Sequence, residues 1–259
     1  MEFSARHIYG GQLRSAVAAS DRPPVSGFVW PVSDAPLAFI ETGGPPRGAQ
    51  EESDGSDSKR NPAEAERVLT VLDGVLSAGE VSTSQIGVVT PYKAQVRLLR
   101  SMWRERGGAQ SRQLEIASVD NFQGREKELV IFSAVRANRG GRVGFLADWR
   151  RLNVLLTRAR RGLVVVGCGA TLRHDALWQQ WLEHAEGMRV VIDKERWHEV
   201  LWRAMRMGTD ASRQLQPSLH ALLPLDYAPD DPDALMRHVE AELGTETRDA
   251  VVPTQVAAP

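Results

Sequence analysis

Short apolar segments alternate with amphipathic ones along residues 86–168, and this alternation most restricts the folds available to the chain. Four apolar segments have the length and unbroken hydrophobicity of buried strands, at 86–90, 115–119, 129–135 and 163–168. Helical patterns occupy 92–108 and 148–162. Continuous apolar strands separated by helices are typical of a parallel sheet covered on both faces. We therefore predict an α/β fold with an open, mostly parallel sheet.

The chain before Asn61 is less regular. It is rich in Pro, Gly, Ser and Asp around one short apolar piece, LAFIE (37–41), so we expect loops, one strand and an exposed acidic loop at 50–60. Asn61 then suits a helix N-cap, and Glu64 stands where the acid of a capping box would stand. The apolar spacing predicts that this helix continues to a stop at Gly79.

Beyond residue 170 the alternation weakens. Helical patterns remain at 174–185 and 194–208, with a strand at 188–193 between them, and the polar, Pro- and Ala-rich end predicts disorder. We therefore expect three parts: a sheet domain at 1–170, a mainly helical C-terminal extension at 171–243 and a disordered tail at 244–259.

Composition indicates an intracellular globular protein. Hydrophobic residues make up 42% and charged residues 25% of the chain, which is ordinary for a globular protein with a core. No apolar run approaches the roughly 18 residues of a membrane span, and the N-terminus lacks an apolar signal segment. The single cysteine, Cys168, suits a reducing compartment, so we expect a cytoplasmic or nuclear location. The histidines lack metal-ligand spacing, and we predict no metal site and no membrane contact.

Two segments place polar residues at strand ends. Residues 90–95 (TPYKAQ) join a strand to a helix whose free N–H groups could hold phosphate, and Tyr92 could stack on a base. An ordinary strand-to-helix turn is the alternative. Residues 118–128 (SVDNFQGREKE) form a dense polar connection in which Gly124 would let the backbone approach a ligand, unless this is a solvated loop. The nine linking residues, 120–128, are fewer than a usual crossover between parallel strands needs.

The third segment, 144–161, has the sequence GFLADWRRLNVLLTRARR. Its helical pattern, with Asp148 as cap, puts Arg151 and Arg158 on one stripe, and arginines held on a docked helix suit recognition of a γ-phosphate. A basic, solvated helix face is the alternative. Ligands of open α/β sheets bind beyond the carboxyl ends of the strands. We therefore expect all three segments to meet there, with Arg158 close to the ends of the strands that precede the other two segments.

Together these segments resemble motifs IV, V and VI of superfamily 1B helicases, in the branch of the up-frameshift helicase of nonsense-mediated decay and senataxin. TPYKAQ, SVDNFQGREKELVIFSAVRAN and GFLADWRRLNVLLTRARRGLVVVG carry the resemblance, and IYGGQLRSAVAASDRP is similar to the preceding segment of that family. The chain departs from the usual pattern at Glu128 and Leu155, where Asp and Ala are common. The resemblance extends over roughly residues 3–170. It implies the second RecA-like motor domain, a P-loop NTPase-type fold without a P-loop.

The resemblance implies a nucleotide site shared between two motor domains. Arg158 would be the arginine finger that reaches ATP bound to the first motor domain. Gly124 and Glu126 would lie at the nucleotide, and Arg151 would support this site.

The resemblance also implies contacts to nucleic acid. Thr90, Ser118 and Gln123 would lie near the backbone of a bound single strand of RNA or DNA, beside Tyr92.

The chain has no Gly-Lys-[Ser/Thr] sequence of a phosphate-binding loop, because its four lysines follow Ser58, Tyr92, Glu126 and Asp193. An Asp-Glu pair that closes an apolar strand and holds magnesium is absent too. The chain begins as though it had been cut after the motifs that would carry the phosphate-binding loop and this acidic pair. We expect ATP and Mg²⁺ to be bound mainly by the first motor domain, in the same protein or in another, and the chain alone to be inactive.

Three hypotheses about function follow. The first is that the chain is half of an ATP-dependent helicase or translocase. The second is a stand-alone remnant that binds nucleic acid or a partner without ATPase activity. The third is a degenerate domain kept for protein contacts. The complete motif VI arginine favours the first.

Overall fold

The computed structural model describes residues 2–12, 17–45, 48–55, 58–106, 113–122, 124–193 and 196–197. The chain divides into two units, Met1–Ala221 and Leu222–Pro259, and every described residue belongs to the first. The predicted tail at 244–259 lies outside the described residues. So do the part of the predicted extension beyond residue 197 and most of the helix predicted at 194–208.

Six parallel strands form the main sheet: β1 (Leu37–Glu41), β4 (Ile86–Thr90), β5 (Glu115–Ser118), β6 (Lys127–Ser133), β7 (Ala159–Gly167) and β8 (Val191–Ile192). Their order across the sheet is β5-β4-β6-β7-β1-β8. Every residue of β4 is buried, as expected of a strand covered on both faces. The prediction of an open parallel sheet is confirmed.

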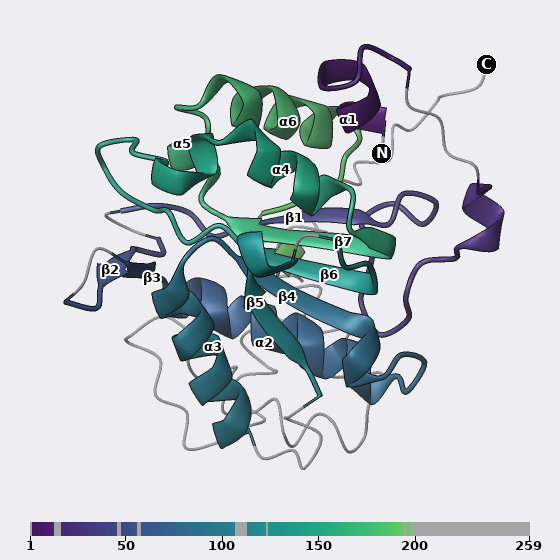
Figure 1. Ribbon diagram of the computed structural model, residues 1–259, viewed down its shortest axis with the longest axis horizontal. Coiled ribbons are helices and arrows are strands. Elements are labelled where there is room, and N and C mark those ends of the chain that lie inside the picture. The colour runs from purple at the N-terminus through teal and green to yellow at the C-terminus, as the bar shows by residue number, and fades with distance from the viewer. Residues whose placement is uncertain are drawn as a thin grey trace, which may run out of the picture. The chain divides into compact units, whose positions relative to one another are not determined.

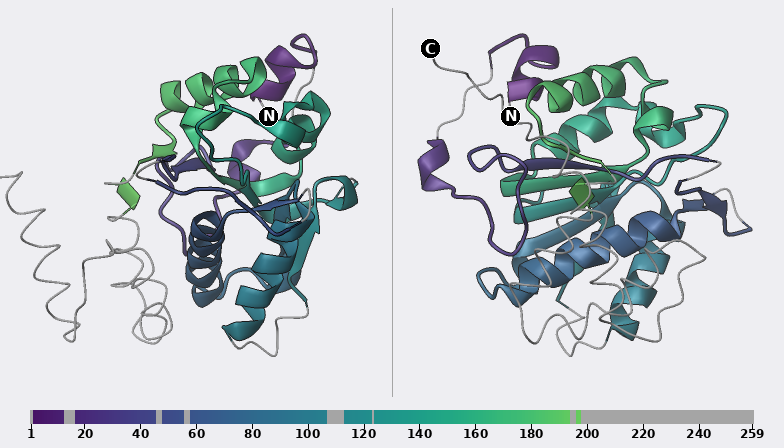
Figure 2. Two further views of the ribbon diagram at one scale, coloured as in Figure 1. Left: turned by 90° about the vertical axis from the view of Figure 1, so that its left-hand side faces the viewer. Right: turned by 180° about the vertical axis from the view of Figure 1, so that it is seen from behind.

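Helices cover both faces of this sheet, as predicted (Figure 1). The α-helices of the described residues are α1 (Glu2–His7), α2 (Pro62–Ser77), α3 (Lys93–Glu105), α4 (Trp149–Leu156), α5 (Gly169–Leu172) and α6 (Ala176–Gly187). Short 3-10 helices are η1 (Ala19–Asp21), η2 (Thr83–Gln85), η4 (Asp120–Phe122) and η5 (Gly144–Ala147). Helices α2 and α3 lie on one face, and α4, α5, α6 and α1 lie on the other (Figure 2). Arg100 of α3 donates from Nη2 to the carbonyl oxygen of Ile116 on β5 at 2.7 Å.

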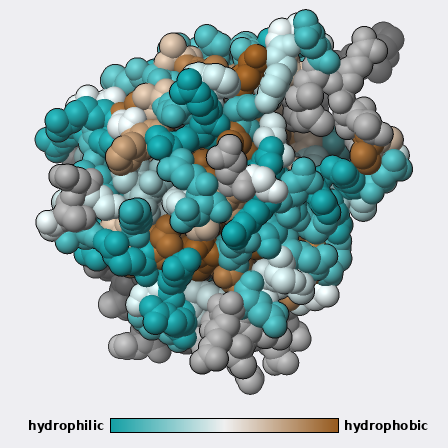
Figure 3. Space-filling model, in the orientation of Figure 1, coloured by the Kyte–Doolittle hydropathy of each residue, from teal (hydrophilic) through white to brown (hydrophobic). Residues whose placement is uncertain are grey.

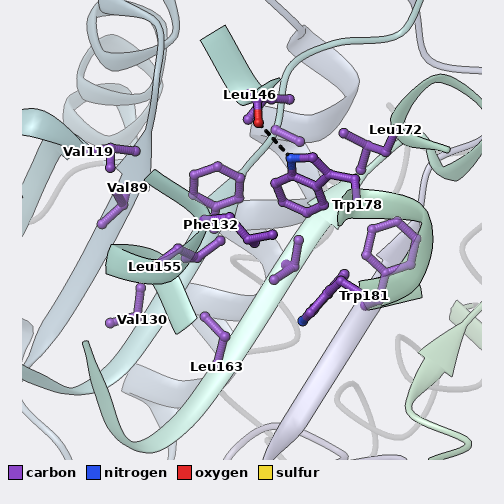
Figure 4. Packing of buried hydrophobic residues seen from close by; sticks show 14 of the residues in the cluster. Val89, Val119, Val130, Phe132, Leu146, Leu155, Leu163, Leu172, Trp178 and Trp181 are labelled. Atoms are coloured by element: carbon purple, nitrogen blue, oxygen red, sulfur yellow. Dashed lines mark hydrogen bonds between the residues drawn. The ribbon is translucent and has the colours of Figure 1, made fainter. Parts of the chain in front are cut away.

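Aromatic side chains fill the core on the face of α4 and α6 (Figure 4). Trp178 and Trp181 of α6 are each 1% exposed, and their ring centroids are 5.6 Å apart. Trp178 Nε1 donates to the carbonyl oxygen of Leu146 at 2.9 Å, and its ring stacks on Phe132 of β6. Burial of such large rings dominates the energetics of a core. Helix α6 is therefore an integral part of the sheet domain.

The strand predicted at 188–193 also belongs to this domain. Its residues Val191 and Ile192 form β8, in which Val191 pairs with Phe39 of β1. We propose on this basis that the sheet domain continues past residue 170, at least to Ile192, in place of a separate extension from residue 171.

Helix α2 begins where the sequence predicts, but Glu64 does not close a capping box. Asn61 Oδ1 accepts from the Glu64 N–H at 3.2 Å, whereas the Asn61 N–H donates to Gln95 Oε1 at 2.8 Å. The Glu64 carboxylate is fully buried, and its Oε2 accepts from Ser133 Oγ and from the Val135 N–H, both at 2.7 Å. Burial raises the pKa of Glu64 to about 8 in spite of these donors. Val135 has a φ of 71°, which is rare for a β-branched residue.

The short connection between β5 and β6 crosses one face of β4, which lies between them. Within this connection, η4 places the fully buried ring of Phe122 against Gly87 of β4. A Cβ at Gly87 would come within 2.5 Å of that ring. The missing side chain at Gly87 therefore lets residues 119–126 pass directly over the sheet, which explains why the connection can be so short.

The helix predicted at 148–162 is correct only in its first half. Asp148 caps α4 as predicted, accepting from the Arg150 N–H at 3.0 Å, but α4 ends at Leu156. From Ala159 onward the chain pairs with β6 as β7, because the sheet hydrogen bonds and the valines that follow favour a strand. The helical stripe expected for Arg151 and Arg158 is therefore wrong, and Arg158 lies in the turn between α4 and β7.

The acidic loop predicted at 50–60 is anchored by its first carboxylate. Two short strands, β2 (Glu52–Ser53) and β3 (Lys59–Arg60), pair as an antiparallel hairpin. Before it, Glu51 Oε2 accepts from Arg136 Nε at 2.8 Å and from the Ala137 N–H and Asn138 Nδ2, both at 2.9 Å. Burial would raise the pKa of Glu51, but these donors outweigh it and lower the pKa. The hairpin is thereby attached to the chain that follows β6.

Candidate functional site

Arg158 lies at the amino-terminal edge of the sheet, directly before β7. Its Nε and Nη2 donate to Thr157 Oγ1 at 3.3 and 3.0 Å. The Arg158 carbonyl oxygen accepts from the Lys127 N–H of β6 at 3.1 Å. The side chain is half-buried, and within the described part of the chain it forms no ion pair with a carboxylate. Its position is fixed by the backbone, while its charge remains available.

The neighbouring arginines differ from Arg158 in this respect. All four of them form ion pairs: Arg150 with Asp148 at 3.6 Å, Arg151 with Asp120 at 3.1 Å, Arg160 with Glu126 at 3.0 Å, and Arg161 with Glu80. Among the five arginines between residues 150 and 161, Arg158 is thus the one that has no carboxylate partner within the described chain.

A cavity of about 920 Å³ opens along this amino-terminal edge. Arg158 and Glu126 line it, together with Tyr9 and Arg22 from the N-terminal segment. Ligand pockets usually measure roughly 300–1,000 Å³, so the cavity has room for a nucleotide. The unpaired guanidinium of Arg158 therefore borders a cavity of suitable size for a nucleotide.

Gly124 and Glu126 come just before β6, at the same amino-terminal edge of the sheet as Arg158. Gly124 has a φ of 79°, and a Cβ built on it would meet nothing within 4 Å. The exposed Glu126 accepts from Arg160 Nε at 3.0 Å. The backbone at Gly124 is therefore open to a ligand, and the Glu126 carboxylate is held by Arg160, two residues after Arg158 in the sequence.

Thr90 and Ser118 lie together at the opposite, carboxyl-terminal edge, where they are partners in the register of β4 and β5. Thr90 is fully buried, and its Oγ1 has no hydrogen-bond partner among the described residues. Ser118 Oγ accepts from the Asn121 N–H at 3.4 Å. Gln123, the third residue expected at the strand, lies outside the described residues.

Tyr92 does not offer the free ring that base stacking requires. It is 2% exposed, and its hydroxyl accepts from Arg136 Nη1 at 3.1 Å. The ring of Phe145 lies 5.6 Å from its own, between centroids. Burial raises the pKa of the Tyr92 hydroxyl. The expectation that Tyr92 stacks on a base is therefore wrong, and the residue supports the carboxyl-terminal edge from within.

Arg151 lies at the carboxyl-terminal end of the sheet and not with Arg158. Its guanidinium donates to both carboxylate oxygens of Asp120, from Nε at 3.1 Å and from Nη2 at 3.3 Å. From Arg151, helix α4 continues for five residues to Leu156, a rise of about 7.5 Å at roughly 1.5 Å per residue, and the turn that contains Arg158 follows. The expected support of the nucleotide by Arg151 does not agree with this position.

The three motif segments therefore do not meet at one edge of the sheet. Thr90, Ser118 and Arg151 gather at the carboxyl-terminal edge, whereas Gly124, Glu126 and Arg158 gather at the amino-terminal edge. The expectation of a single site is wrong because helix α4 and residues 119–126 each run from one edge to the other. The sequence pattern had identified the residues of both groups without separating them.

Phe145 and Trp149, which are 55% and 47% exposed, have no role predicted from the sequence. Both stand in the third segment, and an aromatic beside arginines was the signal that could have identified them. No group of three or more His, Cys, Asp or Glu side chains in the described chain is arranged to hold a metal ion. A search of the same residues finds no helix long and apolar enough to cross a membrane.

A parallel sheet with helices on both faces and motif residues at both edges defines the class as a RecA-like α/β domain. An AAA domain family matches residues 1–170. The chain belongs to the superfamily 1B helicases of the up-frameshift branch and corresponds to their C-terminal domain.

Three relatives illustrate the similarity. The "Regulator of nonsense transcripts 1 homolog" of Drosophila melanogaster is 39% identical over 196 residues, which cover 74% of this chain and 16% of that protein. The "ATP-dependent helicase NAM7" of Saccharomyces cerevisiae is 40% identical over 193 residues, 71% of this chain and 19% of that protein. The "DNA polymerase alpha-associated DNA helicase A" of Schizosaccharomyces pombe is 41% identical over 171 residues, 62% of this chain and 24% of that protein. The matched region is thus a minor part of each relative.

Proposed function

We propose that this chain acts as the second motor domain of an ATP-dependent helicase or translocase. Arg158 is its arginine finger, directed at ATP that the first motor domain binds together with Mg²⁺. The observation that carries the proposal is the guanidinium of Arg158, which forms no ion pair in the described chain and lines a nucleotide-sized cavity beside Gly124 and Glu126. The family relationship and the name of the yeast helicase support ATP as the nucleotide.

The chemistry assigned to Arg158 is charge stabilisation. Charge spreads over the oxygens of a transferred phosphoryl group in the transition state, and a planar guanidinium presents donors in a fork that matches them. Since Arg158 has no carboxylate partner to leave, no ion pair must break before it engages. Thr157 Oγ1 restrains Nε and Nη2 in the meantime. The chain alone is expected to have no appreciable ATPase activity, because the nucleotide is held elsewhere.

At the carboxyl-terminal edge, Ser118 contacts the backbone of a single strand of RNA or DNA, and the buried Thr90 lies beside it on β4. Gln123, which lies outside the described residues, is assigned to the same nucleic-acid strand by the family resemblance alone. The two edges are linked mechanically through α4 and residues 119–126. Arg151 donates a hydrogen bond to Asp120 at the edge proposed for nucleic acid, and the Lys127 N–H donates one to the Arg158 carbonyl oxygen at the edge proposed for the nucleotide. This double connection supports a role in which strand binding at one edge moves the finger at the other.

The test requires a complete motor. The chain would be joined to the first motor domain of a close relative, and ATP hydrolysis measured with and without single-stranded RNA or DNA. Arg158→Ala should lower kcat by roughly 10³–10⁵-fold, the usual contribution of an arginine finger, while nucleotide affinity stays nearly constant. Arg158→Lys should also fail, because a point charge does not replace the fork.

Arg104→Ala is the matched control, since Arg104 is exposed on α3 and its Nε donates to the Arg100 carbonyl oxygen of the same helix. It should hydrolyse ATP like the unmodified motor. Full turnover by Arg158→Ala would remove the finger assignment.

A further inference from the structure

Exposed aromatic side chains are rare on this domain. Among the described residues, the large hydrophobic side chains that are exposed are Tyr9, Phe145 and Trp149, at 43%, 55% and 47%. The face seen in Figure 3 is mostly hydrophilic, with hydrophobic side chains in small separate areas. Phe145 from η5 and Trp149 at the start of α4 are only four residues apart. Both are exposed, so the fold does not use these two aromatic side chains for its core.

Each of the two rings carries an arginine. The Arg151 Cζ lies 5.4 Å from the centroid of Phe145, and the Arg150 Cζ lies 5.4 Å from the centroid of Trp149. The Arg150 side chain is 74% exposed, so its charge is accessible to a ligand. Aromatic rings interleaved with arginines are what single-stranded nucleic acid requires, because bases stack on the rings and phosphates pair with the charges.

Phe145 and its arginine, Arg151, also adjoin both segments expected at the nucleic acid. The ring of Phe145 packs on Tyr92, which follows β4, with 5.6 Å between centroids. Arg151 bonds to Asp120, which follows β5. Phe145 and Arg151 are thus continuous with the carboxyl-terminal edge that carries Thr90 and Ser118, and Trp149 follows them at the start of α4.

We propose that Phe145 and Trp149 form a stacking platform for the bases of a bound single strand, with Arg150 and Arg151 as its phosphate contacts. The proposal rests on the proposed function and deepens it, because it adds contacts to bases where the motif residues supply contacts to the backbone. It also gives the first turn of motif VI a role at the strand, separate from that of Arg158. An apolar protein surface is a less suitable occupant, since guanidinium groups accompany both rings.

The experiment uses this chain and two fluorescent single-stranded oligonucleotides of equal length, one normal and one without bases. Affinity is measured by anisotropy at low salt, where non-specific binding of roughly 10⁻⁴–10⁻⁶ M can be detected. Each aromatic replaced by alanine should weaken binding of the normal strand roughly tenfold, in line with the stacking lost per base. The abasic strand should bind the unmodified chain weakly and be insensitive to both substitutions.

Two substitutions at one position separate stacking from mere hydrophobicity. Trp149→Phe keeps an aromatic face and should retain most of the affinity, whereas Trp149→Leu keeps apolar bulk and should lose it. Because Trp149 is exposed, both variants should unfold at the same temperature as the unmodified chain, which thermal denaturation checks.

The outcomes distinguish this proposal from the one on which it rests. Equal binding of the two oligonucleotides, or full affinity of both alanine variants or of Trp149→Leu, would overturn the platform while leaving the motor assignment intact. Absence of any binding by the unmodified chain at low salt would overturn both. A loss on Trp149→Leu without a loss on Trp149→Phe would support the platform.

Discussion

Arg151 of α4 and Asp120 of the β5–β6 connection are joined by two hydrogen bonds, at 3.1 and 3.3 Å. The hydrogen bond and charge of Asp120 raise the pKa of Arg151. This pair connects helix α4 with residues 119–126 at the carboxyl-terminal edge of the sheet. At the amino-terminal edge, the hydrogen bond from the Lys127 N–H to the Arg158 carbonyl oxygen connects the chain again just after these two segments.

The pair should matter more for coupling than for stability. Asp120 is 68% exposed, and exposed ion pairs contribute roughly 0–1 kcal/mol, so Asp120→Asn should change the free energy of unfolding by less than about 1 kcal/mol. In a complete motor at a saturating concentration of single-stranded RNA or DNA, however, the ratio of ATP hydrolysis with nucleic acid to hydrolysis without it should fall severalfold. Arg151→Ala should reduce this ratio similarly, and the double variant should be no worse than the single ones. Additive losses would show that the two residues act separately.

Gly87 should be intolerant of any side chain. A Cβ there would come within 2.5 Å of the buried Phe122 ring, so Gly87→Ala forces the ring and its connection to move. Overpacking of this kind costs typically 1–3 kcal/mol, and we expect a loss of about that size in urea unfolding followed by tryptophan fluorescence. Gly187→Ala is the matched control, because a Cβ there meets nothing within 4 Å. Equal stability of the two variants would contradict the close crossing.

Glu64 should make the domain less stable as the pH rises. Its pKa is about 8 in the folded protein against an ordinary value of 4.5, so the folded state retains the proton over this interval. The free energy of unfolding should therefore fall between about pH 4.5 and 8, by at most about 1.4 kcal/mol per pH unit for one proton. In Glu64→Gln this contribution disappears. Because Glu41 and Arg67, whose charges act on Glu64, remain in the variant, the difference between the two pH profiles isolates Glu64. Parallel profiles would contradict the raised pKa.

Tyr92→Phe should affect stability and not strand affinity. The substitution keeps the buried ring but removes the acceptor of the bond from Arg136 Nη1, whose guanidinium still pairs with Glu51. Hydrogen bonds to charged groups contribute about 1.5–3 kcal/mol, and a destabilisation near the lower value is expected in urea unfolding. Anisotropy with single-stranded RNA or DNA should give an unchanged affinity. A large loss of affinity would restore Tyr92 to the binding surface.

The sheet could be predicted because its strands are short, apolar and buried on both faces. IGVVT at 86–90 becomes β4 and LAFIE at 37–41 becomes β1 without a shift at either end. The end of α4 could not be predicted in the same way. The residues of TRARR (157–161) favour a helix locally, and only pairing with β6, a contact distant in the sequence, makes Ala159 and the residues after it part of β7.

Only part of the candidate site could be predicted from the sequence, for a similar reason. The motif residues could be named from the sequence, but the edge at which each lies depends on the direction in which the connections cross the sheet. The burial of Tyr92 depends on Arg136, and that of Glu64 on Ser133 and Val135, all distant along the chain. Such contacts leave no local pattern of hydrophobicity or charge.

The two outer strands of the sheet bear on how the protein behaves when concentrated. Unpaired backbone groups along an edge can recruit a strand from another molecule and start aggregation. Here β8 has two residues and β5 has four, and the Ile116 carbonyl of β5 is already occupied by Arg100. Within the described chain, an incoming strand would find few groups with which to pair. Association of these molecules through edge-to-edge sheet extension is accordingly disfavoured.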